Sequence, residues 1–472
     1  MKNERDQNSE NPLLNKLRKG QISRRQFMQM SVAAGLGAAG LSVLNAAPAW
    51  AQDATATAEV STRPLTPTIY QWMIDLHPGI PDVNTAFGDV NQQIAPVAGF
   101  DTSRFVAEAK AGMSTWDLYL GATPFVDMAA LVKTGAIEPW DDYIDPAVLA
   151  DILPAIREES TFEGKLYHWP FLLDIIVQAY NSKITTAAGI ADTAPADWDE
   201  YLADAQKVLD TNSARYGCTF DAHGWRSLVP ITHSISTDVY YTLDKDPNPG
   251  MLFDFTNPAV VQALQLMKKM LDLSSANALQ PGSTDGGVNN TPDEVAFGAQ
   301  QVAYYIKYEN APLRFASTWD DPSALRLGAL PKAKGGAGGT VFWNTGAVLF
   351  KYGQNKQKAA DYMKALTYDA KIWQDSIAGT AQAHPGQLPP YKSIYDGWAA
   401  SKPDWLAAQT WVPTVRAQLD NAKAIPNHAF GLSQFIIGQP LWEKYLSGEE
   451  ADPMVALQAA KDAVVAEIMK TS

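Results

Sequence analysis

Residues 296–310 decide the fold: they read Ala-Phe-Gly-Ala-Gln-Gln-Val-Ala-Tyr-Tyr-Ile-Lys-Tyr-Glu-Asn. They contain the end of a predicted helix that begins after Thr291, with Pro292 at the first helical position and Glu294 three residues after the cap. An apolar strand is predicted over residues 302–306, and polar and aromatic residues follow it. Open α/β sheets bind ligands at the carboxyl ends of their strands. The ligand contacts predicted here are Tyr308, Glu309 and Asn310.

Length and composition indicate a globular protein of more than one domain. A chain of 472 residues exceeds a single compact core, and 46% apolar with 19% charged residues is ordinary for a folded protein. Beyond residue 51 there are 30 basic and 48 acidic residues, a net charge of −18, which argues against nucleic acid as a partner. Cys218 is the single cysteine, so no intramolecular disulfide forms, and we expect it to be a small buried residue.

The N-terminus has the pattern of an export signal. Ser-Arg-Arg-Gln-Phe at residues 23–27 precedes an Ala/Gly-rich apolar run over residues 28–47, and Ala-Trp-Ala at 49–51 is a small-x-small cleavage site. We interpret residues 1–51 as a twin-arginine signal peptide, so that the mature protein starts at Gln52 and is periplasmic. No cysteine stands at the cleavage point, which excludes a lipid anchor there.

Two stretches resemble a known family. Around the predicted strand, the pattern Phe-x-x-Gly-(Lys)-x-Ala-Met-x-Ile is kept at Phe297, Ala303 and Ile306, and it departs at Gln300-Gln301 and at Tyr304. The run over residues 116–144 predicts a strand that ends in a Gly-x-Thr turn, a helix over 124–133, and then Gly-Ala-Ile-Glu-Pro-Trp-Asp-Asp-Tyr-Ile. Both stretches resemble bacterial extracellular solute-binding proteins of family 1, the sugar-type receptors of ABC importers that are similar to maltose-binding protein.

This resemblance implies the fold class and the mechanism. It implies an α/β, two-lobed periplasmic-binding-protein fold, in which each lobe is a mixed, largely parallel sheet flanked by helices and the ligand cleft lies at the hinge. Residues 65–174 plus 300–372 would form lobe 1, and residues 175–299 plus 373–472 would form lobe 2. A sugar, oligosaccharide or polyol would be captured by hinge closure and delivered to the membrane permease subunits of an ABC importer. We expect a monomer without cofactor or metal.

The resemblance also implies further cleft residues. They follow a strand predicted over residues 67–74, the turn at 121–123, the first passage between the lobes at 164–181, the aromatic-rich region 217–241, and a return strand over 340–350. The additional predicted ligand contacts are Trp72, Asp75, His77, Thr123, Trp169, Asp174, Trp225, Trp343 and Asn344. Each aromatic residue among them could instead be a core residue.

No catalytic or metal-binding motif stands out. The six histidines form no His-Glu-x-x-His pattern, and Gly-x-Ser-x-Gly is absent. Asp141-Asp142 lies in a helix-capping context, and Glu158-Glu159 has the pattern of a solvated face. We therefore expect a binding protein, not an enzyme.

Two alternatives remain open from the sequence. An exported carbohydrate-active enzyme could use two carboxylates that converge from distant parts of the chain. Alternatively, the same receptor fold could bind an anionic or amino solute, for which Lys307, Arg226 and Arg314 would supply positive charge.

Overall fold

The computed structural model describes residues 63–470, apart from 98–99, 222–224, 249, 275–282, 286–287 and 381–383, and for 283–285 and 288–290 it describes the backbone alone. The expected signal peptide, residues 1–51, and the expected start at Gln52 lie outside the described residues.

A ten-stranded mixed sheet forms the framework, in the order β2-β1-β3-β15-β7-β13-β8, with β14 on β7 and with β4 and β16 on β15. β1 is parallel to β2 and β3, and β13 is parallel to β8, whereas β15 and β7 join these two groups by antiparallel pairing. Its strands are β1 (Pro67–Ile69), β2 (Gln93–Ile94), β3 (Leu118–Ala122), β4 (Ile137–Glu138), β7 (His168–Asn181), β8 (Tyr216–Phe220), β13 (Val302–Tyr308), β14 (Leu325–Gly328), β15 (Thr340–Phe350) and β16 (Ala422–Lys423).

Helices surround the sheet, and three short hairpins or strand pairs lie outside it. These pairs are β5 (Thr161–Phe162) with β6 (Lys165–Leu166), β9 (Tyr240–Tyr241) with β10 (Leu252–Phe253), and β11 (Ser283–Asp285) with β12 (Val288–Asn290). The helices of the first half are α3 (Gln71–Leu76), α4 (Ile80–Phe87), α5 (Ser103–Lys110), η1 (Pro124–Met128), α6 (Ala129–Lys133), α7 (Pro146–Asp151), α8 (Pro154–Glu159), α9 (Ser182–Ala187), α10 (Trp198–Asp210) and α11 (Trp225–Ile235). Those of the second half are α12 (Pro258–Asp272), α13 (Pro292–Gly298), α14 (Asn310–Ala316), η2 (Pro322–Ala324), α15 (Lys356–Thr367), α16 (Ala370–Ala378), α17 (Lys392–Ser401), α18 (Asp404–Ala407), α19 (Trp411–Gln418), α20 (Gly431–Ser447) and α21 (Pro453–Lys470).

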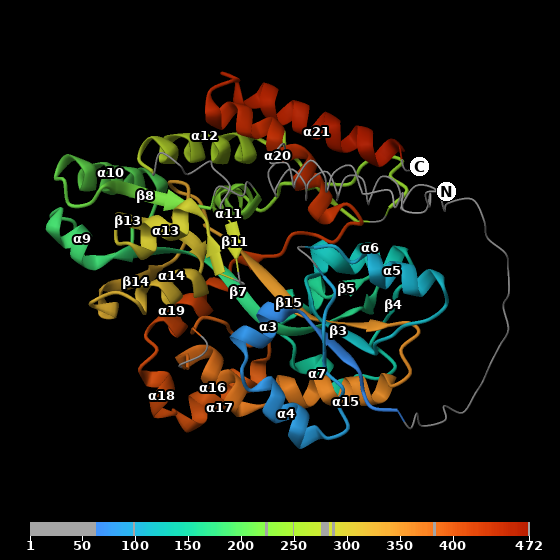
Figure 1. Cartoon of the computed structure of the whole chain (residues 1–472). Coiled ribbons are helices and arrows are strands. Elements are labelled where there is room, and N and C mark those ends of the chain that lie inside the picture. Colours follow the sequence, from blue (N-terminus) through green and yellow to red (C-terminus); the bar gives the residue numbers. More distant parts are fainter. Residues whose placement is uncertain are drawn as a thin grey trace, which may run out of the picture. The chain divides into compact units, whose positions relative to one another are not determined.

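The two longest strands, β7 and β15, lie side by side in the middle of the sheet (Figure 1). In their register Phe342 pairs with Ile175, and Trp343 pairs with Asp174. Phe342 and Ile175 belong to one of the two largest hydrophobic clusters, whereas Trp343 packs in the second. These strands are therefore shared by both halves of the molecule, and the residues at the centre of each strand lie where the halves meet.

Each half has its own core. The lobe 1 core lies around β1, β3 and the helices α3, α4, α15 and α16, and its large buried residues include Trp140, Trp169 and Trp373. The lobe 2 core lies around β8 and the helices α10, α11, α12, α20 and α21, and it includes Phe220 and Trp442. Cys218 is fully buried there, as expected. Because apolar burial drives folding, each half is stabilised mainly by its own cluster.

The bounds of the lobes stay a prediction. Ala303 and Tyr304, which the sequence assigns to lobe 1, pack in the lobe 2 core. Trp373 and Leu388, which it assigns to lobe 2, pack in the lobe 1 core.

Most predicted elements have their expected type, with one error. The predicted strand over 302–306 is β13, and the helix predicted over 124–133 is formed by η1 and α6. The strand predicted over 67–74 is wrong, because the chain is extended only to Ile69 and then forms α3. The amide of Tyr70 still bonds to the carbonyl of Leu120, but that of Met73 bonds back to Tyr70, which starts the helix.

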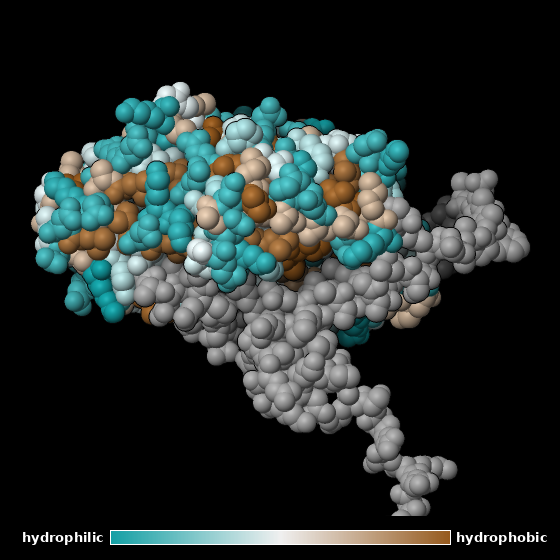
Figure 2. All heavy atoms as spheres, turned by 90° about the horizontal axis from the view of Figure 1, so that it is seen from above, coloured by the Kyte–Doolittle hydropathy of each residue, from teal (hydrophilic) through white to brown (hydrophobic). Residues whose placement is uncertain are grey.

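The outer side formed by α12, α20 and α21 has a mixed surface. Seen from above, hydrophilic and hydrophobic residues alternate over this face (Figure 2). Met454, Val455 and Met469 of α21 are exposed apolar residues. None of the helices in the described part of the chain combines the length and the apolar character needed to cross a membrane.

Candidate functional site

Three aromatic side chains from distant segments meet within the lobe 2 core. Phe125 lies on η1, Trp225 begins α11, and Trp343 lies on β15. Their ring centroids are 5.0 Å apart for Trp225 and Trp343, 5.3 Å for Phe125 and Trp225, and 5.7 Å for Phe125 and Trp343. The two pairs that involve Trp225 pack edge to face, which is favourable for aromatic rings, and Phe125 and Trp343 are tilted by 40°. We call Phe125, Trp225 and Trp343 the aromatic cluster.

The ends of strands bring this cluster together. β3 ends at Ala122, and the single π-turn η1 follows with Pro124 at its first position and Phe125 next. β8 ends at Phe220, and α11 begins five residues later with Trp225. Turns of the π type occur frequently at functional sites. The cluster therefore lies where α/β sheets usually bind ligands.

Polar groups adjoin the aromatic cluster. Thr123 and Thr345 place their hydroxyl oxygens 3.4 Å apart, and the amide of Thr123 donates to Asp127 Oδ2 at 2.9 Å. Burial raises the pKa of Asp127 to about 7, partly offset by the Thr123 amide. Trp343 is 8% exposed, and its Nε1–H has no hydrogen-bond partner among the residues that the structure describes. An unpaired buried donor costs free energy, so it favours a ligand that carries an acceptor.

The predicted contacts Asp174, Glu309 and Asn310 lie together beside the pairing of β7 with β15. Asn310 Nδ2 donates to Asp174 Oδ1 at 2.6 Å, and the amide of Ile175 donates to Glu309 Oε2 at 2.5 Å. Burial raises the pKa of Asp174 to about 7. Burial also raises the pKa of Glu309 well above its usual range, and the nearby Asp174 charge adds to this effect. Glu309 is fully buried, so Asp174 and Asn310 are the members of this group with exposed surface.

Lys307, next to Tyr308, is not free to meet an anion. Its Nζ lies 2.8 Å from Asp221 Oδ2 and 3.0 Å from Asp293 Oδ2 in a buried network. Arg314 bonds Glu294 Oε1 at 3.2 Å in the same network. These carboxylates keep the pKa of Lys307 above its usual value despite its burial.

Four predicted contacts have other surroundings. Trp72 and Asp75 lie on α3, which directly follows the carboxyl end of β1, and Asp75 is exposed and accepts from Gln71 Nε2. His77 is 1% exposed, bonds Ser376 Oγ at 2.7 Å, and burial lowers its pKa to about 3. Trp169 is 1% exposed in the lobe 1 core and donates to Thr367 Oγ1. A ligand role for these residues stays a prediction, but none of them joins the aromatic cluster.

Asn344 lies on the opposite side of β15 from Trp343, because side chains alternate along a strand. It is fully buried and donates to Ser160 Oγ at 2.9 Å. The interpretation of Glu158-Glu159 as a solvated face is wrong for Glu159, which is 5% exposed and lies beside Asn344. Burial raises the pKa of Glu159 well above its usual range.

Sequence reasoning missed Phe125 and Asp127. Both follow the Gly-x-Thr turn that the sequence had identified as a strand end, which is the signal that could have found them. The short helix over 124–133 was predicted, but the π-turn that orients Phe125 cannot be read from local propensity.

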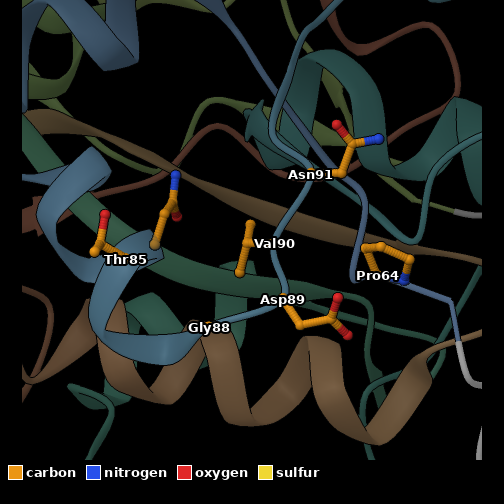
Figure 3. Close-up of a pocket in the computed structure, with 7 residues that line it drawn as sticks. Pro64, Thr85, Gly88, Asp89, Val90 and Asn91 are labelled. Carbon is orange, nitrogen blue, oxygen red and sulfur yellow. The ribbon is translucent and has the colours of Figure 1, made fainter.

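A separate surface pocket lies away from the aromatic cluster (Figure 3). Its volume is about 370 Å³, and it opens between the end of α4 and the first described residues. The residues that line it are Pro64, Asn84, Thr85, Gly88, Asp89, Val90 and Asn91. It contains none of the predicted ligand contacts. In the described part of the chain, no group of three or more His, Cys, Asp or Glu side chains is arranged to hold a metal ion.

Comparison with known proteins identifies the family. The family model described as bacterial extracellular solute-binding protein matches residues 94–413. The chain belongs to this family. By its description the family consists of extracellular binding proteins rather than enzymes, so the chain is a solute-binding protein.

Sequence relatives agree with this assignment. A putative binding protein of Brucella abortus is 27% identical over 328 residues, which cover 65% of this chain and 74% of the relative. A maltotriose-binding protein of Pyrococcus abyssi is 27% identical over 135 residues, 29% of this chain and 27% of the relative.

Solved structures share the fold. Maltose-bound MalE3 of T. maritima has a TM-score of 0.68 at 18% identity and covers 85% of this chain and 99% of its own. The GacH receptor of Streptomyces glaucescens, solved unliganded and with acarbose, has a TM-score of 0.65 at 18% identity and covers 85% and 97%. A Thermotoga lettingae ABC transporter solute-binding protein with bound α-D-tagatose reaches 0.66 at 20% identity over 87% and 100%. The predicted two-lobed α/β fold class is confirmed.

Proposed function

We propose that this solute-binding protein captures a neutral carbohydrate between its lobes and delivers it to the membrane subunits of an ABC importer. The observation that carries the proposal is the aromatic cluster, in which Phe125, Trp225 and Trp343 come from three distant segments and meet in the lobe 2 core, with Phe125 contributed by the part of the chain predicted to form lobe 1. The named ligands of its relatives, which are maltotriose, maltose, acarbose and tagatose, support the same class of solute.

The chemistry beside the cluster suits a sugar. Aromatic faces pack against the apolar C–H faces of a pyranose ring, and a small number of polar groups fix its hydroxyls. Trp343 Nε1–H can donate to a hydroxyl oxygen, and the carboxyls of Asp127 and Asp174 can accept from hydroxyls. Thr123 and Asn310 add exchangeable hydrogen-bonding groups.

The charge distribution favours a neutral solute over an anionic one. An anion would need free cations, but Lys307 is paired with Asp221 and Asp293, and Arg314 is paired with Glu294. Arg226 has its guanidinium over the ring of Trp225, 4.7 Å from the centroid. A neutral sugar leaves these ion pairs intact, whereas an anion would have to compete for them.

We also propose the export route from the sequence. The twin-arginine pattern at residues 24–25 and the small-x-small site at 49–51 support export and cleavage after about Ala51. The family's extracellular location agrees with export in general. We propose as well that the exported protein is a monomer and that it docks on the permease subunits.

A thermal-shift screen against neutral sugars, amino sugars and sugar acids tests the ligand class. A ligand that binds only the folded state raises the melting temperature by mass action. We expect a shift with neutral sugars, and the sugar should be recovered unchanged. A shift with sugar acids alone would contradict the neutral class, and conversion of the sugar would contradict a receptor function.

Matched tryptophan variants test the site itself. Trp343→Ala and Trp225→Ala should abolish the shift produced by the sugar that binds wild type, because each removes a face of the aromatic cluster. Trp398→Ala is the control, since Trp398 packs against Tyr395 and Trp405 on the rim of the lobe 1 core. A sugar-induced shift retained in both Trp343→Ala and Trp225→Ala would remove the cluster from the site.

A further inference from the structure

A short segment of lobe 2, residues 425–431, contacts lobe 1 directly. Ile425 packs in the lobe 2 core. Two residues later, Asn427 Nδ2 donates to the main-chain oxygen of Glu159, at the end of α8, at 2.6 Å. At the other end, Gly431 lies so close to Phe125 that a Cβ placed at residue 431 would come within 2.0 Å of the Phe125 main-chain oxygen. We call residues 425–431 the closing segment.

A second lobe 2 loop supports the closing segment and also contacts lobe 1. His428 Nε2 lies 3.0 Å from Asp246 Oδ2, and Asp246 Oδ1 accepts from the side-chain amide of Asn248. The Oδ1 of Asn248 in turn accepts a hydrogen bond from Lys133 at the end of α6. His428 Nδ1 accepts from the amide of Phe430, so its proton is on Nε2, which donates to Asp246. The closing segment is therefore anchored on its own lobe while it touches the other.

Behind the closing segment, a chain of polar groups runs from Glu159 to the end of β3. Asn344 Nδ2 donates to Ser160 Oγ at 2.9 Å. Ser160 Oγ lies 3.3 Å from His168 Nδ1, and His168 Nε2 lies 3.0 Å from the main-chain oxygen of Ala122. Burial lowers the pKa of His168 to about 4, so the neutral imidazole carries one proton, on Nε2, and its Nδ1 accepts from the serine hydroxyl.

In this series of polar groups, Oδ1 of Asn344 lacks a hydrogen-bond donor unless Glu159 is protonated. Both carboxyl oxygens of Glu159 and Oδ1 of Asn344 are buried and form no hydrogen bond of normal geometry with a described residue, although the Asn344 side chain lies close enough to offset part of the rise in the pKa of the Glu159 carboxyl. A proton on Glu159 supplies the missing donor, because the neutral acid can donate to Asn344 Oδ1. With that proton in place, the hydrogen bonds would run in one direction from Glu159 through Asn344, Ser160 and His168 to Ala122, with an acceptor for each donor.

We propose that the closing segment holds the lobes together beside the aromatic cluster through Asn427 and Gly431, and that Glu159 is the positioning residue that aligns this contact with the end of β3. Ala122, the last acceptor in the polar chain, precedes Thr123 and is three residues from Phe125. The same series of hydrogen bonds therefore fixes the main chain at Glu159, to which Asn427 donates, and the turn that carries Phe125. This inference rests on the proposed closure of the lobes around a solute.

The closing contact can be tested in the ligand-free protein. Asn427→Ala removes the bond to lobe 1, and Gly431→Ala inserts a Cβ where the Phe125 oxygen lies. Both variants should increase the radius of gyration in small-angle X-ray scattering. Both should also shift the tryptophan emission to the red, because opening withdraws Phe125 from Trp225 and Trp343 and admits water.

Matched controls separate closure from general loss of stability. Asn257→Ala removes a side-chain bond to the Asp238 main-chain oxygen within lobe 2, at 3.0 Å, and Gly397→Ala adds a Cβ that meets no atom within 4 Å. Both controls should scatter like wild type. The proposal would be overturned if Asn427→Ala and Gly431→Ala also scattered like wild type. If Gly431→Ala does not fold, the result for Asn427→Ala alone decides the proposal.

Conservative replacement tests the role of Glu159. Glu159→Gln keeps a donor for Asn344 Oδ1, so it should scatter like wild type, whereas Glu159→Ala should resemble Asn427→Ala. The double variant Glu159→Ala with Asn427→Ala should open no further than either single variant, because both act on one contact. Wild-type scattering of Glu159→Ala would remove Glu159 from the proposal. Since no sugar is added, these results do not depend on whether the carbohydrate assignment holds.

Discussion

Two groups of buried carboxyls lie near the candidate site, and they avoid an unpaired charge in different ways. Around Lys307, the carboxylates Asp221 and Asp293 are matched by an ammonium at 2.8 and 3.0 Å. Beside β7, Asp174 and Glu309 have amide partners but no cation within ion-pair distance among the described residues, and burial raises the pKa of both. One group is neutralised by a cation and the other by protons.

This difference assigns separate roles to the two groups. A cation-paired network is rigid, and its charges are already satisfied, so it contributes structure and little ligand chemistry. A carboxyl whose pKa lies near neutrality can donate or accept a hydrogen bond, which suits the hydroxyls of a neutral sugar. The comparison therefore favours Asp174 over Lys307 as a ligand contact, even though Lys307 adjoins the predicted contact Tyr308.

The largest effect is expected from removing the cation. Lys307→Met leaves Asp221 and Asp293 buried without their ammonium, and breaking a buried ion pair in this way typically costs about 3–5 kcal/mol of unfolding free energy. Urea denaturation monitored by circular dichroism measures the loss. The control is Lys371→Met, whose exposed pair with Asp375 on one helix should contribute no more than about 0.5 kcal/mol. A Lys307→Met variant as stable as the control would show that Lys307 does not neutralise Asp221 and Asp293.

The protonated group should make stability depend on pH. The pKa of Asp174 is about 7 in the folded protein against 3.8 as a model value, so between these values the folded state binds more protons than the unfolded state. The free energy of unfolding therefore falls as the pH rises from about 4 to 7, by at most about 1.4 kcal/mol per pH unit for one group, and levels off above pH 7.

Asp174→Asn should reduce the fall in unfolding free energy with rising pH, as measured by urea denaturation between pH 4.5 and 8. Asp145→Asn is a matched control of opposite sign, because the pair with Lys364 holds the pKa of Asp145 below its usual value. The stabilisation by ionised Asp145 is lost only as the pH falls through that low pKa. In Asp145→Asn, the slope of unfolding free energy against pH should therefore stay as in wild type between pH 5 and 7. Equal slopes in wild type and Asp174→Asn would show that Asp174 is ionised throughout this range.

The sequence predicted the strands that carry the candidate site better than the side chains that line it. β13 and β15 follow from apolar runs, and the turn after β3 follows from Gly-x-Thr. Whether Trp169 or Trp343 faces the site depends on which face of a shared strand meets which core, and no local pattern encodes that choice. Glu159 was misjudged for a similar reason, because a pair of acids at a helix end is buried only if another lobe covers it.

A smaller effect on binding is expected at Trp343. Trp343→Phe keeps an aromatic ring in the cluster but removes Nε1–H, the buried donor without a partner among the described residues. One hydrogen bond is worth about 0.5–1.5 kcal/mol, so the affinity for the sugar found in the screen should fall roughly 2- to 13-fold by calorimetry. Trp198→Phe is the control, because it loses a bond to Ser234 in the lobe 2 core and should leave the affinity unchanged. Equal affinities in wild type and Trp343→Phe would show that Nε1–H does not contact the sugar.

The smallest effect is expected where a proton already replaces a cation. Glu309→Gln keeps the size of the side chain and an oxygen that accepts from the Ile175 amide, and its amide hydrogens take the place of the acid proton. A neutral acid replaced by its amide changes no buried charge, so we expect a change below about 1 kcal/mol in unfolding free energy at pH 6. Were Glu309→Gln to cost as much as Lys307→Met, Glu309 would have to be ionised, and the distinction between the cation-paired and the protonated carboxyls would fail. A near-neutral Glu309→Gln beside a strongly destabilised Lys307→Met would establish that distinction in one pair of measurements.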